Sequence, residues 1–388
     1  RMEHWPPTPA PHGLFVNLAR AIKTVTDLPV FTTGRITTPQ FAETILRRGD
    51  ADMIGMTRAH IADPNIVRKI EADQNDDIRP CVGANLCISQ ATEAKVLKCF
   101  YNPDVGKNPK KNETLKSIRP KNVVVIGGGP AGLEAARVSA NLGHKVTLFE
   151  KNTYLGGQLK LWARAPLYRE FNNAVSWFEL QLNKSQVHVI KGKEVNVEEI
   201  KKASPDFVIL ATGSKPRENT VLMKKNVTIK ALSNIDLLRE AFEDKHLVLF
   251  DEGGGRGGLS AVDHLIQYNK ITIVTTDYSI GEFVNPNLRT PIYKSYLSNG
   301  VIFRPQEKFV KLKKNSVVVQ NIFSLKEKTI YKVDYVTFWK GNVVVDELKE
   351  ELKSIDVPFS LVGDCRAPRQ VHIAVAEGAL AARKIGNC

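Results

Sequence analysis

The pattern of hydrophobic and polar positions in residues 1–75 predicts alternating helices and strands, the order that builds a parallel sheet. Apolar residues spaced for amphipathic helices alternate with short apolar runs bounded by turn residues. The pattern predicts three helices and two strands, at residues 13–25, 39–49 and 65–73 and at residues 28–34 and 51–56, respectively. Two strands are too few for a stable parallel sheet. We therefore expect further βα units before this segment.

A polar, charged and turn-rich stretch at residues 104–121 interrupts this pattern, as linkers between domains do. After it, the order strand, glycine turn, helix and strand occurs twice, at residues 122–152 and 246–277. A last strand and a helix rich in small residues occupy residues 359–386.

The two repeats predict an α/β protein with two related nucleotide-binding units. We interpret them as one dinucleotide-binding domain, residues 122–216 and 355–388, split by an inserted domain at residues 217–354.

The composition is that of a globular protein with substantial cores. The chain has 388 residues, of which 43% are hydrophobic, and its apolar stretches are shorter than a membrane span. It starts with Arg1 and shows no secretion signal, which suggests a fragment. Five cysteines fit a reducing cytoplasm better than a disulfide framework. We therefore expect a cytoplasmic protein without a membrane partner.

The formal net charge of +14 raises the question of nucleic-acid binding. The lysines are scattered and lack interleaved aromatic residues, so we interpret them as solvated surfaces and expect no nucleic-acid partner. A basic rim could still steer an acidic redox partner.

The first glycine run has the strongest functional signal. Gly127, Gly129 and Gly132 follow a strand at the spacing GxGxxG, with Ala131 in the same turn, and Glu150 ends the next strand. Such a turn brings helix N–H groups against a pyrophosphate, and the acid can accept hydrogen bonds from ribose hydroxyls. We predict a bound dinucleotide here rather than a merely structural turn.

Three further segments are candidates for contact with the same cofactor. They contain Gly157 and Gln158, Thr212 and Gly213, and Asp364. Each also has a structural interpretation, because the first two segments resemble ordinary turns and Asp364 could cap a helix.

The second glycine run places Gly253, Gly255 and Gly258 at the same spacing, which would suit NAD(P). Two acidic residues, Asp251 and Glu252, put negative charge just before the turn. The alternative is a domain that keeps the fold without the ligand.

In the N-terminal segment, Gly34 and Arg35 follow the first predicted strand, and Gly55 and Arg58 follow the second. If these were the last two strands of an eightfold barrel, the four residues would lie where such barrels bind phosphate. Otherwise the arginines would pair with local carboxylates.

Residues 76–103 contain three clustered cysteines, Cys81, Cys87 and Cys99. Clustered thiols of this kind usually bind a metal. An iron–sulfur cluster takes four thiolates, and Ala84 stands where a CxxCxxC run would have its middle cysteine.

The order of four motifs resembles one family. They are GRITTPQFAETILRRGDADMIGMTRAHIADPNIVRKI, DDIRPCVGANLCIS, VVVIGGGPAGLEAARVSANLGHKVTLFEK and GDCRAPRQVHIAVAEGALAARKI. Together they resemble the multidomain old-yellow-enzyme-like flavoproteins. That family includes trimethylamine and histamine dehydrogenases, dienoyl-CoA reductases and the dimethylglycine or N-methylproline demethylases.

The resemblance implies a fold and a set of cofactors. Residues 1–75 would be the last two βα units of a TIM barrel that holds FMN, with Gly34, Arg35, Gly55 and Arg58 at its phosphate. Cys81, Cys87 and Cys99 would be three ligands of a 4Fe-4S cluster. The split domain would bind FAD or ADP, and the inserted domain would be NAD(P)-like.

This sequence also departs from the family. Six barrel units have no counterpart here, so no catalytic residue can be carried over. With Ala84 the options are a 3Fe-4S cluster, a 4Fe-4S cluster with a ligand from elsewhere, or no cluster. The motif CVGANLC resembles the demethylase branch more than the reductases.

The resemblance therefore implies a flavin and iron–sulfur oxidoreductase. It would oxidise a methylated amine or amino acid, a small-molecule substrate, and could pass electrons to an electron-transfer flavoprotein. The alternatives are an NAD(P)H-dependent enoate or dienoyl-CoA reductase and a catalytically incomplete nucleotide-binding module. The oligomeric state stays open, with a homodimer as one option.

Overall fold

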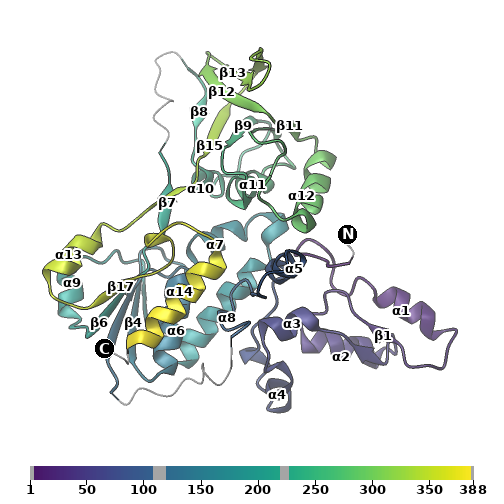
Figure 1. The fold of residues 1–388 in the computed structure, drawn as a ribbon, viewed down its shortest axis with the longest axis vertical. Helices are drawn as coiled ribbons and strands as arrows, with labels where there is room; N and C mark the ends of the chain where they lie inside the picture. The colour runs from purple at the N-terminus through teal and green to yellow at the C-terminus, as the bar shows by residue number, and fades with distance from the viewer. Residues whose placement is uncertain (1–3, 108–118, 219–226, 386–388) are drawn as a thin grey trace. The chain divides into compact units, whose positions relative to one another are not determined.

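A computed structural model describes residues 4–107, 119–218 and 227–385 (Figure 1). It shows the expected mixed α/β class with parallel sheets. The chain divides into two compact units. The first comprises Arg1–Lys160, Glu170–Ser214 and Val344–Cys388, and the second comprises Leu161–Arg169 and Lys215–Val343. Most of the predicted linker, residues 108–118, lies outside the described residues.

The N-terminal segment of the first unit contains a two-stranded parallel sheet. Its elements are α1 Val16–Lys23, β1 Phe31–Thr32, α2 Pro39–Arg47, β2 Met53–Ile54, α3 Thr57–Ala62 and α4 Ile66–Glu71. Phe31 of β1 pairs with Met53 of β2. Val16, Ile36 and Ile45 lie in a small core beside these strands. The two predicted strands and three predicted helices are all present, and α3 is an additional element.

The cysteine segment follows this sheet. It contains the 3₁₀ turn η1 Asn75–Asp77 and the helix α5 Leu86–Thr92. Asn85 precedes α5 in the left-handed conformation, with a φ of 55°, and this turns the chain sharply at the start of the helix.

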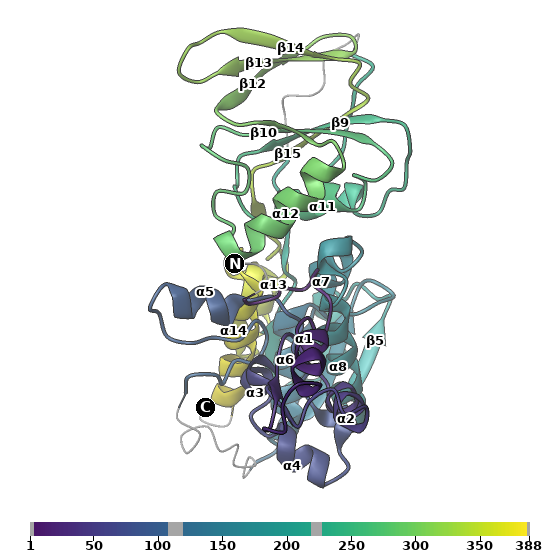
Figure 2. The same cartoon turned by 90° about the vertical axis from the view of Figure 1, so that its right-hand side faces the viewer.

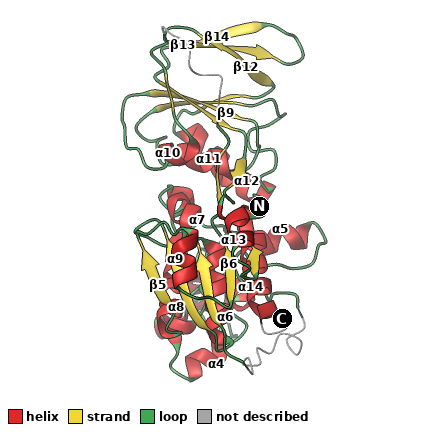
Figure 3. Cartoon of the chain, turned by 90° about the vertical axis from the view of Figure 1, so that its left-hand side faces the viewer, coloured by secondary structure: helices red, strands yellow, loops and turns green. Residues whose placement is uncertain are grey.

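The dinucleotide-binding part of the first unit is built on a parallel sheet in the order β17-β6-β3-β4-β5 (Figure 3). Its strands are β3 Asn122–Ile126, β4 Lys145–Glu150, β5 His188–Lys191, β6 Phe207–Leu210 and β17 Phe359–Leu361. The residues of β3 and β6 are almost all fully buried, as the continuous apolar runs predict for a sheet covered on both faces.

Helices cover both faces of this sheet. One face carries α6 Pro130–Asn141, α8 Phe171–Lys184 and α14 Val371–Lys384, and the other carries α9 Val197–Lys202 and α13 Leu348–Ser354. Gly378 allows α14 to pack closely on α6, because a Cβ atom there would meet the carbonyl oxygen of Ala131 at 2.2 Å. The short elements α7 Gly157–Trp162 and η5 Gly363–Cys365 complete this region, whereas η3 Pro166–Tyr168 belongs to the second unit.

The second unit contains a parallel sheet in the order β11-β10-β9-β15-β8 (Figure 2). The strands are β8 Lys230–Ala231, β9 His246–Asp251, β10 Lys270–Val274, β11 Ile302–Arg304 and β15 Tyr335–Trp339. Read from the other edge, four strands follow the same order as in the first sheet, with the glycine-turn strand at the centre in both; the remaining edge strand differs, because β17 follows the others in the chain and β8 precedes them.

Different layers cover the two faces of this second sheet. An antiparallel sheet of β12 Glu307–Leu312, β13 Ser316–Asn321 and β14 Glu327–Tyr331 packs over one face. The helices α10 Asn234–Leu237, α11 Arg256–Asp263 and α12 Pro286–Ser298 lie on the other (Figure 2). The connecting strands β7 Ser214–Pro216 and β16 Asn342–Val344 pair with each other.

In the part of the chain that the structure describes, none of the helices has both the length and the apolar character needed to cross a membrane.

Candidate functional site

The first glycine turn connects β3 to α6 with the geometry that a dinucleotide requires. A Cβ atom at Gly127 would meet the carbonyl oxygen of Ala211 at 2.3 Å, and one at Gly132 would meet the carbonyl oxygen of Gly127 at 1.9 Å. By contrast, no heavy atom of the described residues lies within 4 Å of a Cβ atom built at Gly129. The backbone at Gly129, directly before α6, therefore faces open space in which N–H groups could meet a pyrophosphate, whereas the side chain of Ala131 is buried.

Glu150 lies at the end of β4 and closes one side of this turn. Its Oε2 accepts a hydrogen bond from the Gly128 N–H at 2.7 Å, and its Oε1 accepts one from the Asn152 N–H at 2.7 Å. The side chain is buried and held in one orientation, while a carboxylate still has lone pairs for ribose hydroxyls. Asn152 was not among the predicted site residues.

Hydrogen bonds through Ser214 connect two of the predicted residues, Gln158 and Asp364. The Gln158 side chain donates to the Ser214 backbone oxygen at 3.0 Å, and the Ser214 hydroxyl donates to Asp364 Oδ2 at 2.8 Å. Sequence reasoning missed Ser214, although its position directly after the ATG turn was a usable signal. The helix-cap alternative predicted for Asp364 is not what the structure shows: the N-cap of α14 is Gln370, without a side-chain cap hydrogen bond, and Asp364 Oδ1 accepts from the Arg369 N–H, ahead of that helix, at 3.0 Å.

The remaining predicted contacts lie around the same turn. A Cβ atom at Gly157 would come within 3.2 Å of Gly129, so this loop closely approaches the phosphate turn. Gly213 faces open space, whereas Thr212 donates its hydroxyl to the Val345 carbonyl oxygen. The structure therefore brings the predicted residues together around one turn, which combines backbone N–H donors with polar side chains.

The predicted phosphate arginines of the N-terminal segment have protein partners. Arg35 is buried, with Nη2 2.5 Å from Glu170 Oε1, and Arg58 donates to Asn85 Oδ1 at 2.5 Å and to the Pro6 oxygen at 2.8 Å. Burial alone would raise the pKa of Glu170, but the hydrogen bond of His12 and the charge of Arg35 hold it below its usual value.

Because of these contacts, the two arginines have few hydrogen-bond donors left for an FMN phosphate. The glycines Gly34 and Gly55 lie in loops after β1 and β2, as predicted. Within the described residues, Nε of Arg35 is buried and has no hydrogen-bond acceptor, so one donor remains for an anion. The alternative of pairing with local carboxylates is not what the structure shows either, because Arg58 donates to an amide and a backbone oxygen, and the carboxylate beside Arg35 comes from the distant Glu170.

The three cysteines of the candidate metal segment are free thiols. Burial raises the pKa of Cys87 to about 11, and the thiols of Cys81 and Cys99 add to the shift. Ala84 is buried in the same loop and offers no ligand atom. Among the described residues, no three or more Cys, His, Asp or Glu side chains are arranged to hold a metal ion. The thiols thus suit a cluster chemically, but the site is not formed.

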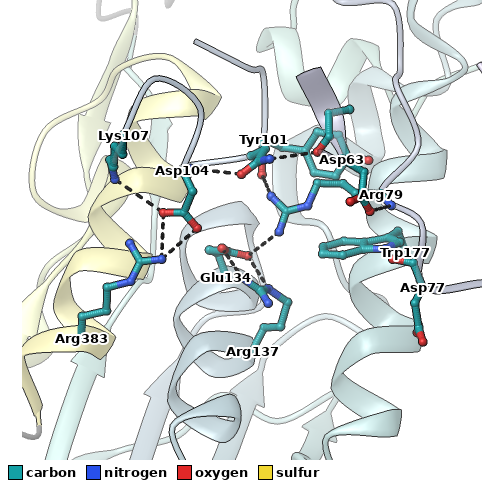
Figure 4. A network of polar contacts seen from close by, with 12 residues as sticks. Asp63, Asp77, Arg79, Tyr101, Asp104, Lys107, Glu134, Arg137, Trp177 and Arg383 are labelled. Carbon is teal, nitrogen blue, oxygen red and sulfur yellow. Dashed lines mark hydrogen bonds and ion pairs between the residues drawn. The ribbon is translucent and has the colours of Figure 1, made fainter. Parts of the chain in front are cut away.

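A buried charge network connects the cysteine segment to the helix that carries the first glycine turn (Figure 4). The Arg79 guanidinium lies 4.3 Å from the Trp177 ring centre and donates to the Tyr101 oxygen at 2.7 Å. Its Nη2 is 3.8 Å from Glu134 Oε2 on α6, and Glu134 also binds Arg137 at 2.7 Å.

The second glycine turn, between β9 and α11, is filled by groups of the inserted domain itself. Asp251 Oδ1 accepts hydrogen bonds from the Gly253 and Gly254 N–H groups at 3.2 and 3.1 Å. A Cβ atom at Gly253 would meet the Trp339 indole nitrogen at 2.5 Å, and one at Gly258 would meet that ring at 3.0 Å. Gly255 caps α11.

Two family models match the chain. Residues 121–378, more than half of its length, match the pyridine nucleotide-disulphide oxidoreductase model, and residues 9–77 match the NADH:flavin oxidoreductase / NADH oxidase family. The chain belongs to the pyridine nucleotide-disulphide oxidoreductase family. The order of the two matches is the order that the resemblance implied, which confirms the prediction of a multidomain flavin-dependent oxidoreductase.

The relatives of this oxidoreductase chain include demethylating enzymes. It is 34% identical to an N,N-dimethylglycine/sarcosine dehydrogenase from Chromohalobacter salexigens, over 96% of this chain and 59% of that protein. It is 32% identical to a probable N-methylproline demethylase from Rhizobium meliloti, over 90% of this chain and 51% of that protein. The chain thus spans between half and three fifths of these relatives.

A solved structure has the same fold as this oxidoreductase chain. The 6-hydroxypseudooxynicotine amine oxidase from Pseudomonas geniculata N1 superposes with a TM-score of 0.90 at 26% identity, over 98% of this chain and 60% of that chain. The described residues therefore have the fold of part of a larger amine oxidase.

Proposed function

We propose that this chain forms the nucleotide-binding and electron-carrying part of a flavoprotein that oxidises a methylated amine or amino acid. The observation that carries the proposal is the open first glycine turn, combined with 34% identity to a dimethylglycine and sarcosine dehydrogenase over almost the whole chain. The chain covers 59% of that relative, so substrate and acceptor belong to the proposal.

The residues of the first turn would hold FAD or ADP. Backbone N–H groups at the start of α6 would bind the pyrophosphate, Glu150 would accept from the ribose, and Asp364 with Ser214 would meet the rest of the cofactor. In this proposal FMN, when bound in the barrel, supplies the two-electron chemistry of C–N oxidation, whereas FAD at the first turn would belong to the electron-transfer chain and ADP there would be structural; the chain contributes binding and orientation.

An iron–sulfur centre on Cys81, Cys87 and Cys99 forms the second part of the proposal. Three thiolates are suitable ligands, and their loop adjoins the charge network that leads to α6. Such a centre would pass electrons singly from the amine-oxidising flavin towards an external acceptor such as an electron-transfer flavoprotein.

The metal part is tested on the whole chain after anaerobic purification and reconstitution with iron and sulfide. We expect about three or four irons per chain, matched by acid-labile sulfide. Cys87→Ala should lose most of this iron. Cys365→Ala is the matched control, because Cys365 is another buried free thiol, located in η5 rather than in the cysteine segment. Equal iron in both variants, or no bound iron in the wild type, would refute the cluster.

The direction of electron flow is tested on the flavin-loaded chain. The proposal expects that NADPH and NADH leave the flavin absorbance unchanged under anaerobic conditions, since the acceptor is external. An NAD(P)H-dependent reductase requires rapid bleaching of the bound flavin by one of them, so bleaching would favour that alternative.

A further inference from the structure

The second glycine turn keeps the strand–turn–helix order of a dinucleotide site but differs in what fills it. β3 is followed by three loop residues, 127–129, before α6, whereas β9 is followed by four, 252–255, before α11. Both helices begin at a glycine cap without a capping side chain among the described residues. The backbone alone therefore does not distinguish a working site from an unused one.

The backbone donors of the second turn are already used. The carboxylate of Asp251, which is fully buried, accepts hydrogen bonds from the Gly253 and Gly254 N–H groups. In the first turn the corresponding amides of Gly127 and Gly128 are also hydrogen-bonded, to the Phe149 carbonyl oxygen and to Glu150 Oε2. The difference in the second turn is that one buried carboxylate, that of Asp251, accepts from both amides. Burial raises the pKa of Asp251 to about 6, so the group is ionised at neutral pH.

The glycines of the second turn accommodate a tryptophan. A Cβ atom at Gly257 would come within 2.2 Å of the Trp339 ring, and the same ring closely approaches Gly253 and Gly258. In the first turn the corresponding close contacts are to backbone, because Gly132 packs on the Gly127 carbonyl. The second glycine run is therefore explained by the indole wedged between the end of β15 and the start of α11.

Two further carboxylates near this turn would repel a phosphate. A Cβ atom at Gly254 would lie 2.7 Å from Asp277 Oδ2, so a second carboxylate adjoins the turn. Glu252 adds a third, although Lys340 pairs with it at 3.2 Å. A pyrophosphate entering here would meet like charges at short range.

We infer that the second glycine turn is closed to NAD(P), with Trp339 filling its glycine surface and the carboxylates of Asp251 and Asp277 adding negative charge beside it, so that pyridine nucleotides are excluded as redox partners of this chain. The inference deepens the proposed function, on which it rests for the flavin at the first turn. The inserted domain then serves as a scaffold without a nucleotide of its own.

The test measures amide hydrogen exchange of the whole chain saturated with FAD, with and without NADPH or NADH. Wild-type residues 252–259 should show no added protection at millimolar nucleotide. The double variant Asp251→Ala, Trp339→Ala removes the internal carboxylate and the indole, and should bind NADPH at least ten-fold more tightly, with protection appearing at 252–259. Asp251→Asn is the matched control, because its amide oxygen can still accept from the two N–H groups and Trp339 stays in place.

Two results would overturn the inference. One is protection of residues 252–259 in the wild type by either nucleotide; the other is a folded double variant with no gain in affinity. If the double variant loses its native circular dichroism, Asp251→Ala alone carries the test, with an expected gain of at least three-fold. Protection of residues 127–133 by FAD is read from the same samples, so a failure of the proposed flavin site is seen separately.

Discussion

At the scale of single residues, the second unit contains a buried acid whose carboxylate is only partly hydrogen-bonded. Asp263, on α11, is buried; its Oδ2 accepts from the Leu167 N–H at 3.0 Å, while its Oδ1 has no hydrogen-bond partner within the described residues. Burial raises the pKa of this carboxyl to about 7. Burial raises the pKa of Tyr168 and Tyr296, and the Asp263 carboxyl adds to both shifts.

Replacing Asp263 with Asn should therefore stabilise the protein in a pH-dependent way. Between the unfolded pKa near 4 and the folded value near 7, the folded state holds a proton that the unfolded chain has lost. Wild-type stability thus falls as pH rises through this window. Asp263→Asn should gain on the order of 2 kcal/mol at pH 8 and little at pH 4, measured by thermal unfolding.

The control for this prediction is Asp27→Asn, at an exposed position. Its effect should stay within about 0.5 kcal/mol at every pH. A stability gain of Asp263→Asn that is the same at pH 4 and pH 8 would contradict the assignment.

At the scale of elements, the cysteine segment is connected to α6 and α8 by buried charge rather than by apolar packing alone. Glu134 is fully buried between two guanidinium groups, Arg79 from the cysteine segment and Arg137 from its own helix. Trp177 on α8 covers Arg79. Removing one partner of a buried ionic group leaves an uncompensated charge, which is costly.

Glu134→Gln should therefore destabilise the first unit by about 3 kcal/mol or more in urea unfolding, because two buried cations lose their carboxylate. Glu198→Gln breaks the exposed pair with Lys201 on α9 and should cost less than about 1 kcal/mol. Similar costs for the two variants would show that the network contributes no more than a surface ion pair.

The same elements show what the sequence could and could not predict. The unit β3–α6–β4 was predictable because the glycine spacing, the apolar strand and Glu150 are all local signals. The antiparallel sheet β12–β14 was not predicted, since its strands mix lysines with apolar residues and pair only across the fold. Ser214 directly follows the predicted turn, but its link to Asp364, 150 residues further along the chain, depends on tertiary contact; Asn152 contacts Glu150 locally, two residues apart.

The properties of the second glycine turn could be predicted from the sequence only in part. The acidic residues beside it are visible in the sequence, and they raised the alternative of an unused fold. The contact of Asp251 with the turn amides, and the position of Trp339, which lies more than 80 residues further along the chain, depend on the pairing of β9 with β15. Local spacing cannot report such a contact.

At the scale of the whole molecule, two compact units with separate cores carry two related nucleotide folds, only one of which has an open turn. Their unfolding should be resolvable by calorimetry as two transitions. FAD or ADP at one hundred times its Kd should stabilise the unit that contains Gly127–Gly132 by about 2.7 kcal/mol and leave the other transition unchanged. Equal shifts of both transitions would contradict a single nucleotide site.

The most direct test of this account is calorimetric titration of the whole chain with FAD, followed by competition with ADP. Gly129→Asp is a suitable block, because the position has room for a side chain and would carry negative charge into the expected pyrophosphate site. Gly255→Asp, at the corresponding cap of α11, is the matched control. We predict one FAD per chain, displaced by ADP, with affinity reduced at least one hundred-fold in Gly129→Asp and unchanged in Gly255→Asp. Two FAD per chain, or loss of binding in Gly255→Asp alone, would contradict the account.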